Sequence, residues 1–201
     1  MDCANRRIST FTWSNGDPLA EVPWVAQWAG IGGAPGGPNN YILQAGVVEV
    51  SANTTKYRFF TENYPAQSAV LHGPSIAAGD QAYVTVSTTL SNGQYLTSYF
   101  VENETTGTYS AYDVNTSDVS EWSAEFETEA NPGFGVPQFT SVAFSGCSVY
   151  YGPNGGPFGD ETYTEQVDES YDSSTGQYIP LMTPTAVDST NAGFTVNFKN
   201  P

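Results

Sequence analysis

The chain has 201 residues, of which 21 are acidic and 5 are basic, so its formal net charge is −16. This charge excludes a nucleic-acid-binding protein, because no cationic surface is available to displace counterions from phosphates. It also argues against adsorption to an anionic membrane, and no apolar run approaches the roughly 20 residues of a membrane helix. The length predicts a single domain over residues 1–201 that can bury a core of its own.

The composition favours a turn-rich β protein. Aromatic residues make up 14% of the chain and charged residues only 13%, beside 20 glycines and 13 prolines. The aromatic content argues against disorder despite the high net charge. A surface whose charges are mainly carboxylates repels itself at neutral pH and relaxes when acid protonates it. The protein is therefore better suited to an acidic medium than to pH 8.

No segment has a convincing 3.6-residue apolar period, whereas period-two runs are common and are separated by Gly, Pro and Asn. In chain order, the predicted strands are residues 41–50, 56–64, 82–87, 95–102, 108–114, 121–129, 138–151 and 193–199. Residues 95–102 and 108–114 are the arms of a predicted hairpin around residues 103–107. Two glycine-rich stretches, 30–37 and 152–159, are predicted as turns. Strands at this spacing, without helices between them, predict an antiparallel sandwich or barrel.

Histidine and cysteine are too scarce for several kinds of site. The lone histidine, His72, is predicted as a loop residue beside Gly73-Pro74, and it leaves little room for a Ser-His-Asp or Cys-His nucleophile. One histidine and two cysteines also fall short of the three or four protein ligands of a usual zinc site. We therefore expect no metal. Cys3 and Cys147 are compatible with one long-range disulfide or with two free thiols.

Three short sequences match the acceptor pattern for N-linked glycosylation: Asn53-Thr-Thr, Asn103-Glu-Thr and Asn115-Thr-Ser. Acceptor sites of this kind belong to surface segments of secreted proteins. They favour a secreted glycoprotein.

The segment Glu121–Glu129 carries an unusual row of carboxylates. As a strand, it places Trp122, Ala124, Phe126 and Thr128 on one side and Glu121, Ser123, Glu125, Glu127 and Glu129 on the other. Two interpretations are open: a solvated strand face, or a concave sheet face that holds carboxylates for acid chemistry. Gln44 and Glu62 lie in predicted strands that could line the same concavity.

Several stretches, in order along roughly residues 28 to 196, resemble the glutamic peptidases of the eqolisin type, which are known chiefly as secreted fungal acid proteases. The stretches are Trp28-Ala-Gly-Ile31, Leu43-Gln-Ala-Gly46, Glu62-Asn-Tyr-Pro65, Ala78-Gly-Asp80, Glu102 to Gly107, Ala124-Glu-Phe-Glu-Thr-Glu129 and Phe144 to Val149. The sequence departs from the family pattern at Gly32, where an acidic residue is usual. The family's opening strand also has no clear counterpart before residue 6.

The resemblance implies a fold and a reaction. The fold would be a bent, lectin-like (concanavalin-like) sandwich of two antiparallel sheets, with a peptide substrate across the concave face. Glu129 would act as the general base on an attacking water, and Gln44 would hold that water and stabilise the oxyanion. Glu62 would support the site, with Trp28 and Tyr64 lining the cleft. No cofactor is implied, and we expect a secreted monomer that acts on proteins or peptides.

Two other functions suit a concave, aromatic, carboxylate-rich sandwich. A retaining glycoside hydrolase needs two carboxyl groups about 5 to 5.5 Å apart, and the alternating glutamates keep that possibility open. A non-catalytic carbohydrate-binding module would use the aromatic side chains as sugar platforms. Cleavage of a protein substrate in acid separates the peptidase from both alternatives.

Overall fold

The structure is a computed structural model that describes residues 22–33, 41–51, 55–116, 123–130, 141–151, 154–157, 169–172, 177–180 and 182–198. Within these ranges the regular secondary structure consists of β-strands alone, and every strand pair is antiparallel. This confirms the all-β, antiparallel prediction. The chain divides into two compact units, Ile8–Pro137 and Met1–Arg7 with Gln138–Pro201, which are described separately below. The single domain over residues 1–201 stays a prediction.

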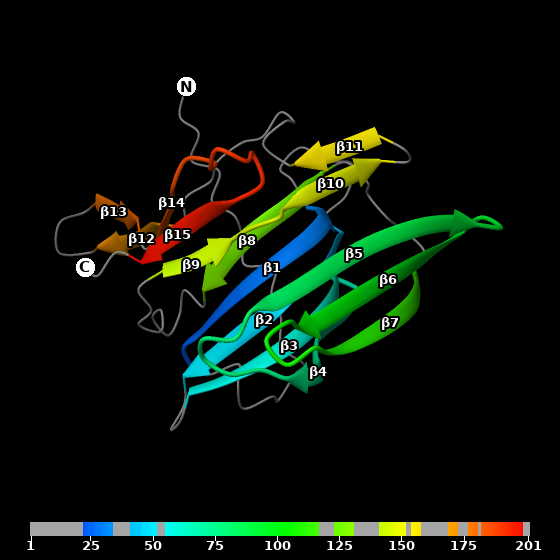
Figure 1. The fold of residues 1–201 in the computed structure, drawn as a ribbon, viewed down its shortest axis with the longest axis horizontal. Helices are drawn as coiled ribbons and strands as arrows, with labels where there is room; N and C mark the ends of the chain where they lie inside the picture. Colours follow the sequence, from blue (N-terminus) through cyan, green and yellow to red (C-terminus); the bar gives the residue numbers. More distant parts are fainter. Residues whose placement is uncertain are drawn as a thin grey trace. The chain divides into compact units, whose positions relative to one another are not determined.

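The unit Ile8–Pro137 contains two sheets (Figure 1). The five-stranded sheet has the order β4-β3-β2-β1-β8, and the three-stranded sheet has the order β5-β6-β7. The strands are β1 (Trp24–Gly32), β2 (Ile42–Ser51), β3 (Thr55–Tyr64), β4 (Gln67–Ser75), β5 (Ala82–Ser91), β6 (Gln94–Asn103), β7 (Thr108–Thr116) and β8 (Ala124–Ala130). Residues 104–107 form the turn of the β6–β7 hairpin, as predicted.

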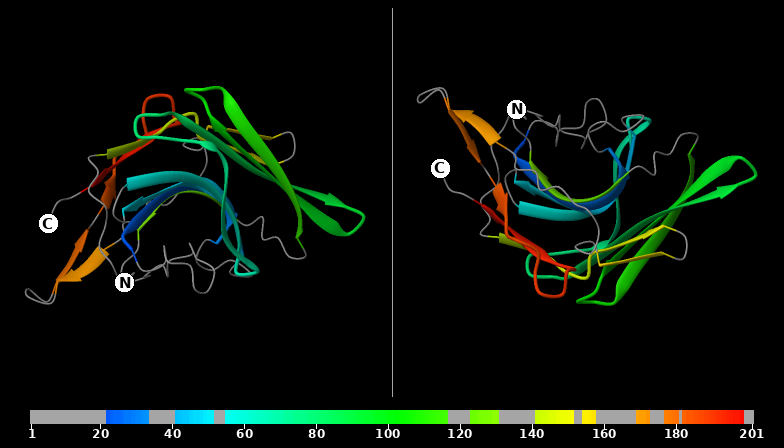
Figure 2. Two further views of the ribbon diagram at one scale, coloured as in Figure 1. Left: turned by 90° about the horizontal axis from the view of Figure 1, so that it is seen from below. Right: turned by 90° about the horizontal axis from the view of Figure 1, so that it is seen from above.

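An inter-sheet cluster joins these two sheets. Its buried members are Leu43, Ala45, Val47 and Phe59 from the five-stranded sheet, and Tyr99 and Val101 from the three-stranded sheet. Alternate residues of a strand point to opposite faces, so Gln44 and Glu62 lie on the other side of the five-stranded sheet. Figure 2 shows that sheet curved, with the three-stranded sheet against its convex side. The predicted sandwich of two antiparallel sheets is therefore confirmed.

The concave side of the five-stranded sheet carries a second apolar cluster, here called the concave-face cluster. Its buried members are Trp24, Ala26, Trp28, Ile42, Val48, Val50, Phe60 and Ala69. Strand β2 is thus buried on both faces, and Gln44 shares its concave face with Ile42, Gly46 and Val48. A polar side chain on this face needs partners within the protein, because burial without a hydrogen bond is costly.

The unit formed by Met1–Arg7 and Gln138–Pro201 contains short strands. They are β9 (Ser141–Phe144), β10 (Ser148–Tyr151), β11 (Asn154–Pro157), β12 (Glu169–Asp172), β13 (Gln177–Pro180), β14 (Met182–Pro184) and β15 (Phe194–Phe198). Stacked rings of Phe144 and Phe194 join β9 to β15, with centroids 4.7 Å apart. Cys147 is a buried free thiol whose pKa burial raises to about 11, so it is poorly reactive. Cys3 lies outside the described residues.

The prediction for His72 was wrong, because this residue lies in strand β4. Gly73-Pro74 interrupts the alternation, and a register shift of the β3–β4 pairing between Leu71 and Ser75 absorbs the interruption. His72 Nε2 lies 2.8 Å from Thr61 Oγ1, and the imidazole stacks on Tyr112 with ring centroids 3.7 Å apart. His72 therefore connects the five-stranded sheet to Tyr112 of the three-stranded sheet.

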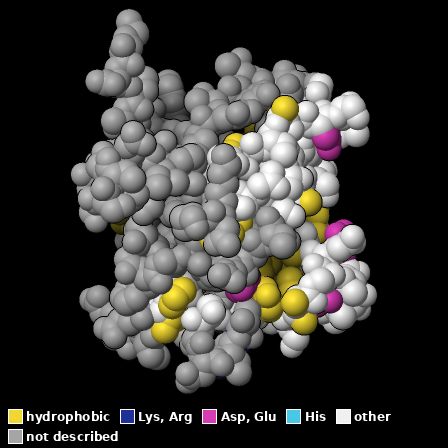
Figure 3. All heavy atoms as spheres, turned by 90° about the vertical axis from the view of Figure 1, so that its left-hand side faces the viewer, with side chains coloured by type: hydrophobic (Ala, Val, Ile, Leu, Met, Phe, Trp, Pro, Cys, Tyr) yellow, Lys and Arg dark blue, Asp and Glu magenta, His cyan; other side chains and the backbone are white. Residues whose placement is uncertain are grey.

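Asp and Glu side chains are visible among the described residues on the face drawn in Figure 3. Among the described residues, no helix is long and apolar enough to cross a membrane.

A first prediction concerns Gly46, which has no room for a side chain. A Cβ there would lie 2.7 Å from Trp28 Cβ and would also clash with the Gln27 carbonyl oxygen. We expect Gly46→Ala to lower the free energy of unfolding by about 1–3 kcal/mol through overpacking. Urea denaturation would measure this loss, and an unchanged midpoint would show that Trp28 does not pack over Gly46.

A second prediction concerns His72 and acid. Burial lowers the pKa of His72, so the unfolded chain binds this proton more readily than the folded protein does. Stability should therefore fall as the pH drops from the ordinary histidine value of about 6.5 toward the lowered folded value. In urea denaturation, His72→Gln should lose less stability than the wild type between pH 7 and pH 5. Equal losses would contradict this prediction.

Candidate active site

Gln44 and Glu62 form a buried polar pair at the centre of the concave face. They are direct partners in the β2–β3 register, and Gln44 Nε2 donates a hydrogen bond of 2.7 Å to Glu62 Oε2. The two side chains are 0% and 2% exposed. A short bond to a charged acceptor is about twice as strong as a neutral one. The pair therefore holds the amide in one orientation.

The Gln44 amide has a second Nε2 hydrogen and an Oε1 atom that the bond to Glu62 does not use. Nε2 carries two hydrogens, and only one of them is needed for the bond to Glu62. Gln44 Oε1 is buried and accepts no hydrogen bond from the described residues. Buried polar atoms without a partner are uncommon in folded proteins and are often found where a ligand or water binds. The amide thus offers a donor and an acceptor at one point.

Trp28 and Glu129 form the second polar contact of this face. Trp28 Nε1 donates to Glu129 Oε2 over 3.3 Å, and the two side chains are 1% and 3% exposed. Glu129 lies opposite Ala26 in the β1–β8 register, so it shares the face of Trp28. Trp28 belongs to the concave-face cluster and also donates a hydrogen bond to a carboxylate.

Strand β1 relates Gln44 to Glu129. Gly30 lies opposite Gln44, and Ala26 lies opposite Glu129, with Trp28 between them on the same face. A Cβ on Gly30 would lie only 3.0 Å from Trp28 Cζ3, so one edge of the indole covers Gly30. The opposite edge carries the Nε1 that binds Glu129. The indole therefore lies along β1 between the row of Gln44 and the row of Glu129.

The glycines beside Trp28 lie in strands. Gly30 and Gly32 belong to β1, so the predicted turn at 30–37 was wrong for these two positions. Gly155 and Gly156 likewise lie in β11, within the predicted turn at 152–159. A Cβ on Gly30 would lie 3.0–3.3 Å from two atoms of the Trp28 ring, so the missing side chain leaves room for the indole.

The remaining sequence candidates lie around this centre. Tyr64, at the end of β3, is partly buried and packs against the concave-face cluster. Glu125 and Glu127 in β8 lie opposite Gly30 and Trp28, so they share the face of Glu129 and are half-buried. The alternation predicted for this segment holds over β8. Glu121 and Trp122 lie outside the described residues.

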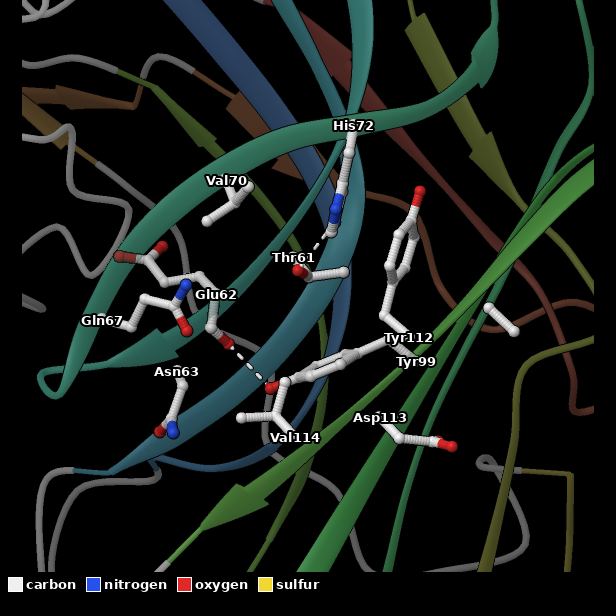
Figure 4. A pocket seen from close by; sticks show the side chains of 11 residues that line it. Thr61, Glu62, Asn63, Gln67, Val70, His72, Tyr99, Tyr112, Asp113 and Val114 are labelled. Carbon is white, nitrogen blue, oxygen red and sulfur yellow. Dashed lines mark hydrogen bonds between the residues drawn. The ribbon is translucent and has the colours of Figure 1, made fainter.

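Tyr99 supports the site from behind, and the sequence analysis missed it. Its hydroxyl donates to the Glu62 carbonyl oxygen over 3.2 Å from the three-stranded sheet (Figure 4). Burial, helped by the negative charge of Glu62, raises the pKa of Tyr99 above its ordinary value, so the hydroxyl keeps its proton. The only signal in the sequence is that Tyr99 falls on the apolar, alternating face of residues 95–102.

A cavity of about 450 Å³ lies behind strand β3, on the side where Tyr99 packs (Figure 4). Its inward-pointing side chains include Thr61, Asn63, His72 and Tyr112. Neither Gln44 nor Glu129 lines it. Glu62 and Asp113 also line it, so Glu62 is shared between this cavity and the hydrogen bond to Gln44.

The concave face can perform acid–base chemistry with an oriented amide. A carboxylate exchanges protons in acid, and an amide N–H stabilises a developing negative charge without titrating. Within the described ranges, no three His, Cys, Asp or Glu side chains are grouped so that they could hold a metal ion.

Comparison with known proteins gives a consistent picture. A model of the Peptidase A4 family matches residues 4–194. Aspergilloglutamic peptidase from Aspergillus niger superposes with a TM-score of 0.66 at 24% identity, over 88% of this chain and 99% of that one. Scytalido-glutamic peptidase with a transition state analog inhibitor gives 0.62 at 20% identity, over 89% and 85%. No curated protein sequence gives a significant match.

A third structure, SCP-B of the eqolisin family in complex with the tripeptide Ala-Ile-His, gives a TM-score of 0.57 at 19% identity, over 90% of this chain and 84% of that one. These structures share the fold of the chain, and the family model adds the relationship in sequence. The alternatives of a glycoside hydrolase and a carbohydrate-binding module are not favoured.

A third prediction tests the buried pair. In Glu62→Ala, the Gln44 amide loses its acceptor while it stays buried, so the free energy of unfolding should fall by about 1–3 kcal/mol beyond the effect of the lost side-chain packing. Glu62→Gln is the matched control, because its amide oxygen can still accept from Gln44 Nε2. Equal urea midpoints for the two variants would show that the hydrogen bond does not stabilise the fold.

Proposed function

The chain belongs to the Peptidase A4 family and is a glutamic-type endopeptidase, and on that premise we propose that Glu129 and Gln44 form its catalytic dyad. The observation that carries the proposal is the Gln44 amide, which Glu62 holds at 2.7 Å while Oε1 accepts no bond from the described residues. Such an amide is oriented before any substrate arrives. Preorganised donors of this kind contribute strongly to catalysis.

Glu129 is the proposed general base. Its carboxylate takes a proton from a water molecule, whose oxygen attacks the carbonyl carbon of the scissile peptide bond. The proton then passes to the leaving amine nitrogen as the carbon–nitrogen bond breaks. The hydrogen bond from Trp28 Nε1 restricts the orientation of this carboxylate. No bond forms between the enzyme and the substrate.

Gln44 is the proposed oxyanion stabiliser. Its second Nε2 hydrogen donates to the oxygen of the tetrahedral intermediate, and Oε1 accepts a hydrogen bond from the attacking water. Glu62 is a supporting residue that keeps the amide in this orientation. Trp28 and Tyr64 line the cleft beside the dyad. The half-buried Glu125 and Glu127 extend the polar lining along β8.

The setting of the enzyme is part of the proposal. It acts on proteins or peptides in acid, where protonation relieves the repulsion within a chain of net charge −16. The three glycosylation sequences support secretion and modification by N-linked glycans. The proposal treats the enzyme as a monomer. It binds neither nucleic acid nor membrane, since the chain offers few cations to either.

A fourth prediction tests the dyad. Cleavage of a denatured protein substrate is measured from pH 2 to pH 7 and should occur only at the acidic end of this range. Glu129→Gln should lower kcat by about 10²–10⁴-fold, and Gln44→Ala should lower it by about 10²–10³-fold. Glu104→Gln, which changes an exposed carboxylate of the β6–β7 turn, is the control and should retain full activity.

Urea midpoints would establish that each variant is folded. Near-normal activity of folded Glu129→Gln or Gln44→Ala would show that the dyad is assigned to the wrong residues. Chelators and inhibitors of aspartic peptidases should leave the wild-type activity unchanged. Strong inhibition by either class would contradict the proposed mechanism.

A further inference from the structure

Two of the three glycosylation acceptors lie in described residues, and their surroundings are opposite. Asn103 ends strand β6, and Asn115 lies near the end of strand β7. The two strands pair directly, so both asparagines belong to one hairpin. Asn53 lies outside the described residues. The sequence pattern treats Asn103 and Asn115 alike, so only their environments can distinguish them.

Asn103 is buried, with 1% of its side chain exposed. Its Nδ2 donates to the Ser75 carbonyl oxygen over 2.9 Å and to Asp80 Oδ2 over 2.8 Å, which uses both amide hydrogens. Its Oδ1 accepts from the Thr106 backbone N–H over 3.3 Å. An N-linked sugar would replace one of these hydrogens and would need space where the folded protein has none. Asn103 therefore has to remain unmodified in the folded protein.

Asn115 is exposed on the outer face of the three-stranded sheet. Its partner in the β6–β7 register is Leu96, which is 38% exposed. Directly opposite residues of an antiparallel pair have side chains about 4.5–5.5 Å apart at Cβ, so a sugar on Asn115 would lie over Leu96. Strand β7 also ends the order β5-β6-β7 among the described strands.

We propose that Asn115 is the acceptor of this hairpin and carries an N-linked oligosaccharide, whereas Asn103 carries none. In the reaction, Asn115 Nδ2 forms a bond to C1 of an oligosaccharide donor linked to a lipid pyrophosphate. The bond from C1 to the pyrophosphate oxygen breaks, the lipid pyrophosphate leaves, and the amide loses one proton. The inference rests on the proposed secretion but not on the proposed dyad.

The glycan has a physical role at this position. The edge of a sheet presents unpaired N–H and C=O groups, and an exposed edge promotes pairing between molecules. A bulky, hydrated oligosaccharide on β7 would hinder such pairing and would cover the exposed Leu96. Modification at Asn115 should therefore reduce aggregation without adding contacts to the core.

The test is to secrete the full chain from a yeast host and to map glycans on its peptides by mass spectrometry. Ser117→Ala destroys the acceptor pattern at Asn115 and leaves that asparagine in place. Thr105→Ala does the same for Asn103. We expect Ser117→Ala to lose the glycan of this hairpin and Thr105→Ala to keep it. A glycan on Asn103 in the folded, secreted protein, or an unmodified Asn115 in the wild type, would overturn the proposal.

Activity is measured on the same samples, so the two proposals can fail separately. An Asn115 glycan on a folded but inactive wild-type enzyme would contradict the proposed dyad and leave the glycosylation site standing. Acid activity without an Asn115 glycan would contradict the proposed glycosylation site and leave the proposed dyad standing. Aggregation followed by light scattering should be faster for Ser117→Ala than for the wild type at equal concentration. Equal rates would exclude the role assigned to the glycan at the β7 edge.

Discussion

The hydrogen bond between Gln44 and Glu62 is the constraint on which the concave face depends. Strands β2 and β3 carry apolar clusters on both faces, so the buried amide of Gln44 and carboxylate of Glu62 satisfy each other within the protein. Because the two residues are direct partners across β2 and β3, the sheet register itself places them at bonding distance. The pair is therefore as rigid as the strands that carry it, which suits an amide required to bind a transient oxyanion.

The absence of side chains matters as much as their presence. A Cβ on Gly30 would press on the Trp28 ring, and a Cβ on Gly46 would press on Trp28 Cα and Cβ. With both positions empty, the indole lies along the sheet from the row of Gln44 to the carboxylate of Glu129. One side chain thus packs in the core and donates a hydrogen bond to Glu129.

The three-stranded sheet does more than cover the core. Tyr99 crosses the interface and bonds the backbone of Glu62, while His72 and Tyr112 stack at the edge between the sheets. These contacts support the site strand from the side that the concave face does not use. Acid has two opposite effects on stability. It removes negative charge from a strongly acidic chain, and it protonates His72, whose pKa is lowered by burial. The β6–β7 hairpin of the same sheet carries two glycosylation acceptors. Asn103 is buried and therefore closed to modification, whereas Asn115 is exposed and accessible.

The sequence by itself determined the all-β class, most strands of the sandwich and the carboxylate row of Glu125, Glu127 and Glu129, because period-two alternation is a local property of a strand. It also singled out Gln44 and Glu62 through short motifs. Only the tertiary structure decided that these two residues face each other, that Trp28 contacts Glu129, and that Tyr99 supports Glu62. Strand β4 was missed because Gly73-Pro74 imitates a turn, and its bulged pairing depends on β3 rather than on its own residues. Local pattern fixes which face a side chain takes, whereas register and sheet packing, which depend on distant segments, decide what it meets there.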